Sequence, residues 1–353
     1  MNGKQLITNG KLTALYYGTL CRALFFLMLL AGCDRRDITY YLESELMIEA
    51  DWILSQLPDE EQGHGATTLF YNAANGTLFK LLPMGSRENE DVRLPQGCYH
   101  AVIFNRSMNS FSNIIFSGSE TYETLKACAR QVETRTDPET RVTTRVIVST
   151  PEELAGDVAE FRDVTEAMLG NYNMPESGNT RAAEDKNPES YIVRLTPQKL
   201  TQRVRVRATV PGINNIRSAV GLLNGVSEGV FLSTRLPTTG TVTQQFDMPD
   251  IKYDEGSPFN GILTGEFNVF GFDRTTPRKL VLKTLLVDGK TIVEQTFNVT
   301  SRDIVEEDGT LTIYIEIVSE KLPDVKPEGN PDSGFDTDVD EWGDPIEEEI
   351  PLK

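Results

Sequence analysis

The sequence predicts an all-β protein built from two tandem β-sandwich domains with a few short helices. Three observations lead to this prediction. Apolar and polar residues alternate over many short segments, which is the period of a strand with one buried face. Gly, Pro, Asn and Asp punctuate those segments at turn positions. The chain has 353 residues, 39% of them hydrophobic and 25% charged, which suffices for two packed cores.

A signal-peptide pattern opens the chain. Arg22 precedes the apolar run ALFFLMLLAG, which is shorter than the roughly 20 residues of a membrane span and has the length of a signal-peptide core. The pattern Leu-Ala-Gly-Cys that ends at Cys33 resembles a bacterial lipobox. We therefore expect residues 1–32 to be a lipoprotein signal peptide and Cys33 to carry lipid, palmitate included, as an outer-membrane anchor. A plain apolar segment that is not cleaved is the alternative.

The first domain is predicted over residues 33–190. In ESELMIEA, Leu46, Ile48 and Ala50 alternate with polar neighbours, as in an amphipathic strand. The pair Asn75-Gly76 separates two apolar runs and predicts a hairpin. The segments GCYHAVIFN and NIIFSG are apolar enough to be buried strands.

Two short helices are expected in the first domain. Ser117 and Glu120 have the spacing of a capping box at the start of one helix. Thr150 precedes Pro151 and Glu153, which is typical of the start of a second helix. The polar, turn-rich segment 173–190 is predicted to link the two domains.

The second domain is predicted over residues 191–320. RVRVRATV places apolar side chains on one face and arginines on the other, and we interpret the arginine stripe as a solvated sheet face rather than a polyanion site. Asp288-Gly289 predicts a hairpin turn. TLTIYIEI is expected to bury its apolar face, which consists of Leu311, Ile313, Ile315 and Ile317.

Two cysteines, Cys98 and Cys128, lie in the first domain. In an exported protein they could form a disulfide that closes a loop of about 30 residues and contributes roughly 3–4 kcal/mol. Two free thiols are the alternative, because the sequence does not give the distance between the two Cα atoms.

Residues 321–353 are predicted to be an acidic, Pro-rich tail with a candidate terminal strand over 346–352. The net charge of −19 argues against a nucleic-acid partner and against electrostatic docking on anionic lipid.

The candidate catalytic and metal-binding motifs each lack a residue that the motif requires. GVSEG resembles a nucleophile elbow around Ser227, but both histidines of the chain lie far upstream, so we interpret it as a hairpin turn. The acids from Asp336 to Glu347 have calcium-loop spacing, but Glu341 replaces the required glycine. No zinc spacing is present, and we expect no metal and no cofactor.

The motifs also carry a family resemblance. A lipobox, a strand ending in Asp51-Trp52 and the segment LPQGCYHAVIFN resemble the N-terminal domain of fimbrillin-like lipoproteins of the Bacteroides type. VPGINNIRSAVGLLNGVSEGVFLSTRLPT, GILTGEFNVFGF and VDEWGDPIEEEIPL are similar to a largely uncharacterised subgroup of that superfamily. The resemblance covers nearly the whole mature chain.

The resemblance implies two transthyretin-like, Greek-key sandwiches on an outer-membrane lipid anchor, as in fimbrial subunits that assemble by strand exchange. In such subunits a protease cleaves after an arginine in the first domain, a strand leaves, and a neighbour's terminal strand replaces it. Arg87 and Arg93 are the candidate cleavage sites. The candidate donor strand would present Ile346, Ile350 and Leu352. Its three successive glutamates depart from an apolar donor, because burying charge is costly, and favour a terminal, anchoring or non-polymerising member.

We therefore expect a non-enzymatic, lipid-anchored structural protein at the cell surface, related to fimbrial (pilus) subunits and serving as an anchor, tip or adhesion component. Its expected partners are the outer membrane and other fimbrial subunits. A surface binding module for a glycan or a host protein on the same anchor is the alternative. A hydrolase with paired carboxylates is the third hypothesis, because Asp and Glu residues are abundant. No motif in the sequence singles out a particular pair of them.

Overall fold

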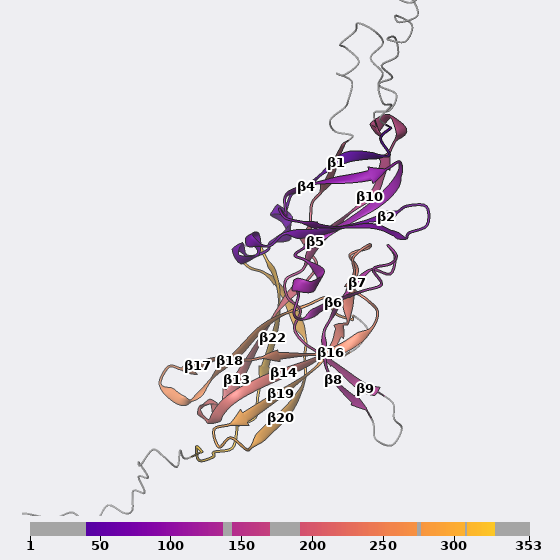
Figure 1. Cartoon of the computed structure of the whole chain (residues 1–353). Coiled ribbons are helices and arrows are strands. Elements are labelled where there is room, and N and C mark those ends of the chain that lie inside the picture. The colour runs from indigo at the N-terminus through magenta and orange to yellow at the C-terminus, as the bar shows by residue number, and fades with distance from the viewer. Residues whose placement is uncertain (1–39, 137–142, 170–190, 274–276, 308, 329–353) are drawn as a thin grey trace, which may run out of the picture.

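The computed structural model describes residues 40–136, 143–169, 191–273, 277–307 and 309–328. They form an elongated body, and the described chain starts near one end of it and finishes near the other (Figure 1). The helices of the described residues are short 3-10 turns: η1 (Ile53–Ser55), η2 (Asp59–Gly63), η3 (Met108–Ser110), η4 (Glu166–Leu169) and η6 (Ile213–Asn215).

The described strands are β1 (Glu43–Ala50), β2 (Ala66–Asn72), β3 (Leu78–Met84), β4 (Asn89–Pro95), β5 (Gly97–Asn105), β6 (Ile114–Ser117), β7 (Lys126–Ala129), β8 (Gln131–Thr136), β9 (Thr143–Val148), β10 (Ala155–Val164), β11 (Ile192–Leu195), β12 (Gln198–Lys199), β13 (Gln202–Pro211), β14 (Ile216–Ser227), β15 (Gly229–Phe231), β16 (Thr241–Asp247), β17 (Asp250–Asp254), β18 (Ser257–Val269), β19 (Lys279–Leu286), β20 (Ile292–Asn298), β21 (Ser301–Val305) and β22 (Leu311–Val318). They form five sheets, whose strand orders are β11-β1-β4 (sheet 1), β12-β10-β5-β2-β3 (sheet 2), β15-β7-β6 (sheet 3), β20-β19-β14-β16-β9-β8 (sheet 4) and β17-β18-β13-β22-β21 (sheet 5). The predicted all-β class is confirmed.

Sheets 1 and 2 form the N-terminal sandwich. The predicted alternation in β1 is confirmed, because Leu46, Ile48 and Ala50 are buried against sheet 2, where Phe70 and Ile103 belong to the same apolar cluster. The hairpin at Asn75-Gly76 joins β2 to β3, as expected, with the glycine at a φ of 71°. A glycine is favoured there because left-handed backbone is unfavourable for other residues.

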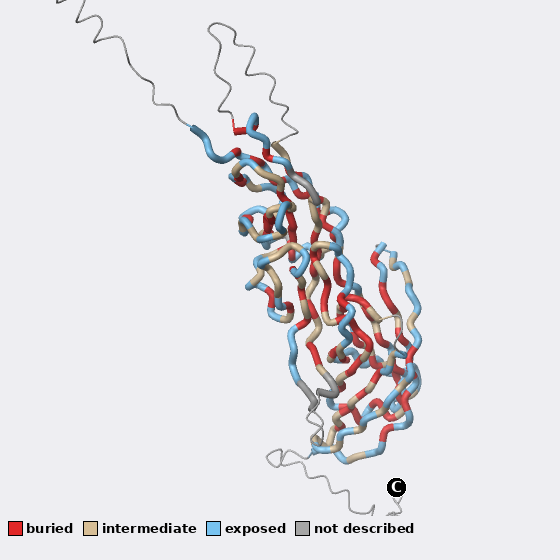
Figure 2. The backbone as a smooth tube through the Cα atoms, turned by 90° about the vertical axis from the view of Figure 1, so that its right-hand side faces the viewer, coloured by how far each residue is buried: buried red, intermediate tan, exposed pale blue. Residues whose placement is uncertain are grey.

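The other face of sheet 2 packs on sheet 3 and forms a junction layer between the two sandwiches. Leu69, Tyr71 and Phe104 of sheet 2 share an apolar cluster with Leu125 and with residues from the second half of the chain. Sheet 2 is therefore apolar on both faces, which explains why β2 is buried along nearly its whole length. Figure 2 shows buried stretches in both halves and in the junction.

Sheets 4 and 5 form the C-terminal sandwich. The predicted alternation in β13 is confirmed, because its four apolar side chains are fully buried in the core of this sandwich. On the opposite face, Arg205 pairs with Glu266 at 2.7 Å and with Glu306 at 3.3 Å. This pairing supports the interpretation of the arginine stripe as a sheet face rather than a polyanion site. The predicted hairpin at Asp288-Gly289 joins β19 to β20.

Strands from each half of the chain pair with strands of the other half. In sheet 4, β9 lies parallel to β16, with Ile147 opposite Thr243. In sheet 3, β15 lies antiparallel to β7. β11 and β12 follow residue 190 in the chain but belong to sheets 1 and 2. The predicted domain boundary at residue 190 stays a prediction, and strand pairing crosses it in both directions.

Both predicted helices of the first domain are wrong. Residues from Ser117 to Ala129 form the end of β6, a turn at Gly118 and then β7, because Leu125, Ala127 and Ala129 are buried with the period of a strand. The Thr150 region is an extended approach to β10. Glu153 does not complete a helix cap there, since it pairs with the Lys199 amine at 2.8 Å. Tertiary pairing outweighs the local helix signals at both places.

Two strand details also differ from expectation. Leu311 is 46% exposed, although Ile313, Ile315 and Ile317 on the same face of β22 are buried, so the buried stripe begins at Ile313. The segment around Ser227 is no hairpin: β14 ends there after a bulge, and the chain passes from sheet 4 into β15 of sheet 3. Its glycines serve this crossing, since a Cβ on Gly229 would lie 2.2 Å from the carbonyl oxygen of Ala127.

Candidate functional site

The first candidate site is β1, the first described strand and one that lies upstream of both candidate cleavage arginines. β1 lies in the middle of sheet 1, parallel to β11 and antiparallel to β4. Leu46 and Ile48 are at most 1% exposed. Full burial of two such side chains stabilises the fold by roughly 3–6 kcal/mol. β1 is therefore an integral strand of the N-terminal sandwich.

The two predicted processing arginines lie downstream of three strands. Arg87 is half-buried in the turn between β3 and β4. Arg93 lies within β4 and not in an exposed loop of the kind that a processing site would need, and its side chain is 3.7 Å from Glu45 on β1. No Lys or Arg occurs from residue 37 to residue 79. A cut at either arginine therefore severs β1, β2 and β3 together from the rest of the chain.

The two cysteines are separate free thiols in this structure, so the disulfide alternative is not realised. Cys98 on β5 donates its thiol hydrogen to Asp163 at 3.5 Å. Desolvation and the neighbouring Asp163 raise the pKa of Cys98, and desolvation raises that of Cys128. Both thiols are thus poor nucleophiles at neutral pH. Cys33, the donor-strand residues 346–352 and the acids from Asp336 to Glu347 lie outside the described residues.

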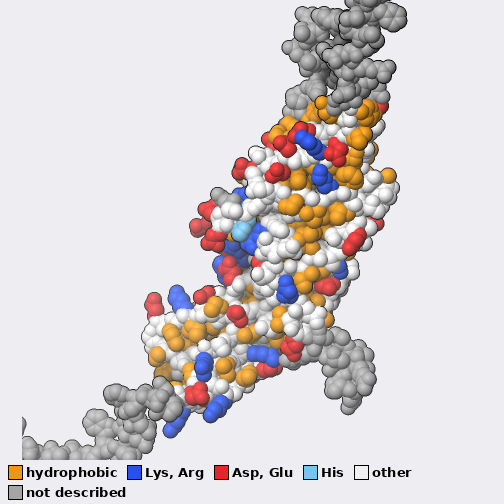
Figure 3. Space-filling view, in the orientation of Figure 1, with side chains coloured by type: hydrophobic (Ala, Val, Ile, Leu, Met, Phe, Trp, Pro, Cys, Tyr) orange, Lys and Arg blue, Asp and Glu red, His pale blue; other side chains and the backbone are white. Residues whose placement is uncertain are grey.

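Among the described residues, the structure does not bring together the side chains that the nucleophile motif around Ser227 would require. Ser227 is buried, and its neighbours include no histidine: His64 follows η2, and the imidazole of His100 stacks on Tyr122 with ring centres 4.3 Å apart. Within the described ranges no three His, Cys, Asp or Glu side chains gather as a metal site would require. No helix in that part of the chain has the length and apolar character needed to cross a membrane. Figure 3 shows acidic and basic side chains interspersed over the visible face.

A buried ion pair joins η2 to the residue that follows β5. Arg106 donates hydrogen bonds from Nε to Glu61 Oε2 at 2.7 Å and from Nη2 to Glu61 Oε1. Burial raises the pKa of Glu61, but the hydrogen bond and charge of Arg106 outweigh burial, so that this pKa lies below its ordinary value. Asn105 joins this pair to the approach of β10 through the carbonyl oxygen of Glu153 at 3.1 Å.

A polar groove lies where sheet 1 ends, between η1, the β3–β4 turn and the end of β11. We call it the Trp52 groove, because Trp52 anchors it: its indole nitrogen donates to the carbonyl oxygen of Arg87 at 2.6 Å. The Arg87 guanidinium lies over the Trp52 ring, 5.8 Å from its centre. The groove residues used below are Glu49, Asp51, Trp52, Ile53, Gln56, Arg87, Glu88, Asn89 and Arg194.

The sequence predictions missed the Trp52 groove as a site. Arg87 was considered as a cleavage site, whereas the structure holds it against an indole ring 35 positions upstream. A usable signal was the polar run from Ser86 to Glu90 between two strands, which marks an exposed turn. Trp52 after an acid gave no such signal, because a buried core tryptophan has the same local sequence.

The described residues form a β protein of two interlocked sandwiches, in which sheet edges and surface grooves are the candidate binding sites. The chain belongs to the family described as a domain of unknown function, DUF5119, which matches residues 32–247. This match extends across the predicted domain boundary. No curated protein matches the chain.

Three solved structures are among those similar to this chain. A Bacteroides ovatus protein described as a candidate adhesin is 17% identical, with a TM-score of 0.53 over 83% of this chain and 99% of that one. A second candidate adhesin from Bacteroides ovatus is 11% identical, with a TM-score of 0.45 over 81% and 91%. A fimbrilin from Porphyromonas gingivalis is 9% identical, with a TM-score of 0.33 over 80% and 100%. The first of these likenesses shows that this chain shares the fold of that candidate adhesin.

Proposed function

We propose that this chain is a non-enzymatic structural protein of the cell surface with an adhesion role, held at the outer membrane by lipid on Cys33. The lipobox and the fold shared with a candidate adhesin support this proposal. The observation that carries it is the integral position of β1. The N-terminal sandwich stays complete after export, so the chain acts as an anchoring or terminal component rather than as a polymerising subunit.

The absence of Lys and Arg between β1 and β2 supports the proposal that the N-terminal sandwich stays complete. An arginine-specific protease has no site there, because residues 37–79 contain no Lys or Arg. A cut after Arg87 would have to remove β2 as well, and Phe70 and Tyr71 of β2 are fully buried. Loss of β2 would expose the cores on both faces of sheet 2.

Two measurements test the proposal. Labelled palmitate should mark the wild-type chain in its native host and should fail to mark Cys33→Ala, while both chains are exported. Limited digestion of the folded mature protein with an arginine-specific protease should leave the fragment that contains β1 bound to the remainder on size-exclusion chromatography. A label-free wild type would refute the anchor, and a freely released fragment that contains β1 would refute the closed sandwich.

Association with other fimbrial subunits remains part of the proposal through residues 346–352 as the donor strand. Deletion of these residues should abolish capture of partner subunits in surface pull-downs and leave folding unchanged. Full capture by the truncated chain would refute a donor role.

A further inference from the structure

The Trp52 groove presents hydrogen-bonding side chains that the fold does not use. Arg87 Nη1 is buried without a hydrogen-bond partner among the described residues. Leaving such a group unpaired costs roughly 1–3 kcal/mol, so a native structure that retains one calls for an explanation. The turn that carries Arg87 is fixed from both sides, because the Ala50 amide donates to the carbonyl oxygen of Glu88 at 2.7 Å.

Acceptors lie beside this donor. The carboxylate of Glu88 is exposed and has no hydrogen bond or ion pair within the described chain. Asp51 Oδ1 accepts the amide hydrogen of Ile53 at 3.0 Å, which leaves the second carboxylate oxygen for another donor. Asn89 and Gln56 add amide groups, each of which both donates and accepts.

The charges of the groove select the class of ligand. Three acids and two arginines line it, and one of the arginines, Arg194, is paired with Glu49 at 3.1 Å. A surplus of acid disfavours a phosphate or another strong anion. The unpaired carboxylate oxygens and the amide groups of Asn89 and Gln56 favour a ligand whose groups both donate and accept, and a hydroxyl is such a group.

We propose that the Trp52 groove binds a saccharide of a surface glycan, an inference that rests on the proposed adhesion role. Glu88 and Asp51 accept hydrogen bonds from sugar hydroxyls, and the amide of Asn89 pairs with a neighbouring hydroxyl. Ile53, which is 78% exposed at the rim, offers an apolar surface to the C–H face of the ring. The Trp52 ring is only 7% exposed and serves as the support of Arg87 rather than as a stacking platform.

The backbone of the groove is held in an unusual conformation. Gln56 adopts a φ of 49°, which is uncommon for a residue other than glycine. Such conformations cost of order 1–3 kcal/mol and cluster at binding sites, where the surrounding structure maintains them. Gln56 closes η1 and lines the groove, so this conformation fixes one wall before any ligand arrives.

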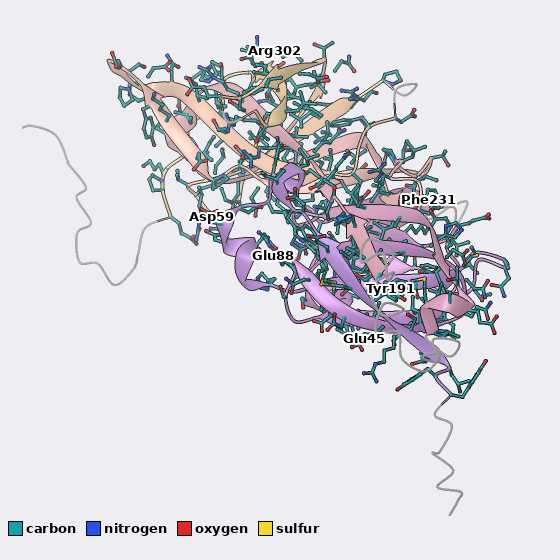
Figure 4. The ribbon with its side chains drawn as sticks, turned by 90° about the horizontal axis from the view of Figure 1, so that it is seen from above. Glu45, Asp59, Glu88, Tyr191, Phe231 and Arg302 are labelled. Atoms are coloured by element: carbon teal, nitrogen blue, oxygen red, sulfur yellow. The ribbon has the colours of Figure 1, made fainter. Side chains whose placement is uncertain are left out.

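The test measures binding of the intact mature chain to a printed array of neutral and uronate-containing oligosaccharides, followed by interferometry on the strongest hit. Glu88→Ala should weaken that binding about tenfold, the size of one lost hydrogen bond to a charged group. The matched control is Glu45→Ala, which removes an exposed acid of β1 in sheet 1, outside the groove. Figure 4 labels Glu45 and Glu88 at separate places of the N-terminal sandwich. The control should bind as the wild type does.

Three outcomes would overturn the inference. They are a silent array, equal binding by wild type and Glu88→Ala, and loss of binding on Phe259→Ala, which changes an exposed aromatic residue of the distant β17–β18 hairpin. Thermal melting of each variant shows whether it is folded. Labelling with palmitate is independent of the array, so a labelled chain with a silent array sinks this inference and leaves the proposed function standing.

Discussion

Replacing Glu61 with alanine should destabilise the N-terminal sandwich by about 3 kcal/mol. The Glu61 and Arg106 side chains are 6% and 18% exposed, so the pair is close to fully buried. Breaking a buried pair by removing one partner costs about 3–5 kcal/mol, because the other charge stays buried without compensation. The small exposure of Arg106 places the value at the low end of that range. Arg106 also adopts a φ of 63°, which its contacts must maintain.

Thermal unfolding followed by circular dichroism measures this effect. In a chain of this size each 1 kcal/mol shifts Tm by roughly 2–4 °C, so Glu61→Ala should lower Tm by about 6–12 °C. The control, Glu45→Ala, breaks an ion pair whose side chains are 59–66% exposed. Exposed pairs contribute less than about 1 kcal/mol, and its Tm should change by less than about 4 °C. Equal melting of the two variants would refute the argument that burial decides the strength of these pairs.

Three further predictions concern the core, the crossing strand and pH. Ile315→Ala, at a fully buried position, should cost about 3 kcal/mol in urea unfolding, whereas Leu311→Ala, at a position 46% exposed, should cost well under half of that; similar costs would contradict the burial pattern of β22. Gly229→Ala should lower the free energy of unfolding by about 2 kcal/mol, because its Cβ would meet the carbonyl oxygen of Ala127, and an unchanged denaturation midpoint would show that β7 can move. The folded pKa of Glu61 is depressed, so its carboxylate stabilises the fold above the unfolded pKa of about 4.3 and loses that contribution as pH falls through the folded pKa. The difference in the free energy of unfolding between wild type and Glu61→Gln should therefore be largest at pH 7 and vanish in acid. A difference that grew as the pH fell would contradict a depressed pKa of Glu61.

The sequence allowed the strands to be predicted where one face is buried, and failed where partners come from far along the chain. The alternation in β1 and β13 and the turns at Gly76 and Gly289 are local properties, and all four are confirmed. β7 has a helix-like sequence but is a strand, because it is held between β6 and β15, the latter about a hundred residues downstream. No local pattern encodes a partner at that separation.

The Trp52 groove was likewise predictable only in its local features. The groove combines residues of η1, the β3–β4 turn and the end of β11, and only folding brings these three segments together. The sequence could identify each segment as polar and exposed. It could not show that the Arg87 turn is fixed by Trp52, or that Arg93 lies inside a strand, because both facts depend on the pairing of β1 with β4.

The interlocked sheets bear on the proposed anchoring role. The junction layer joins Leu125 and Phe104 from the first half of the chain to Val230 from the second half in one apolar cluster. Removing β1 would expose the core it covers in sheet 1, and removing β2 would open this junction as well, so loss of a first-half strand would also weaken the contacts that hold the second half. A polymerising subunit needs a strand that leaves without that consequence. In this chain the two halves are coupled through the shared junction cluster, which fits the proposed anchoring role better than strand release.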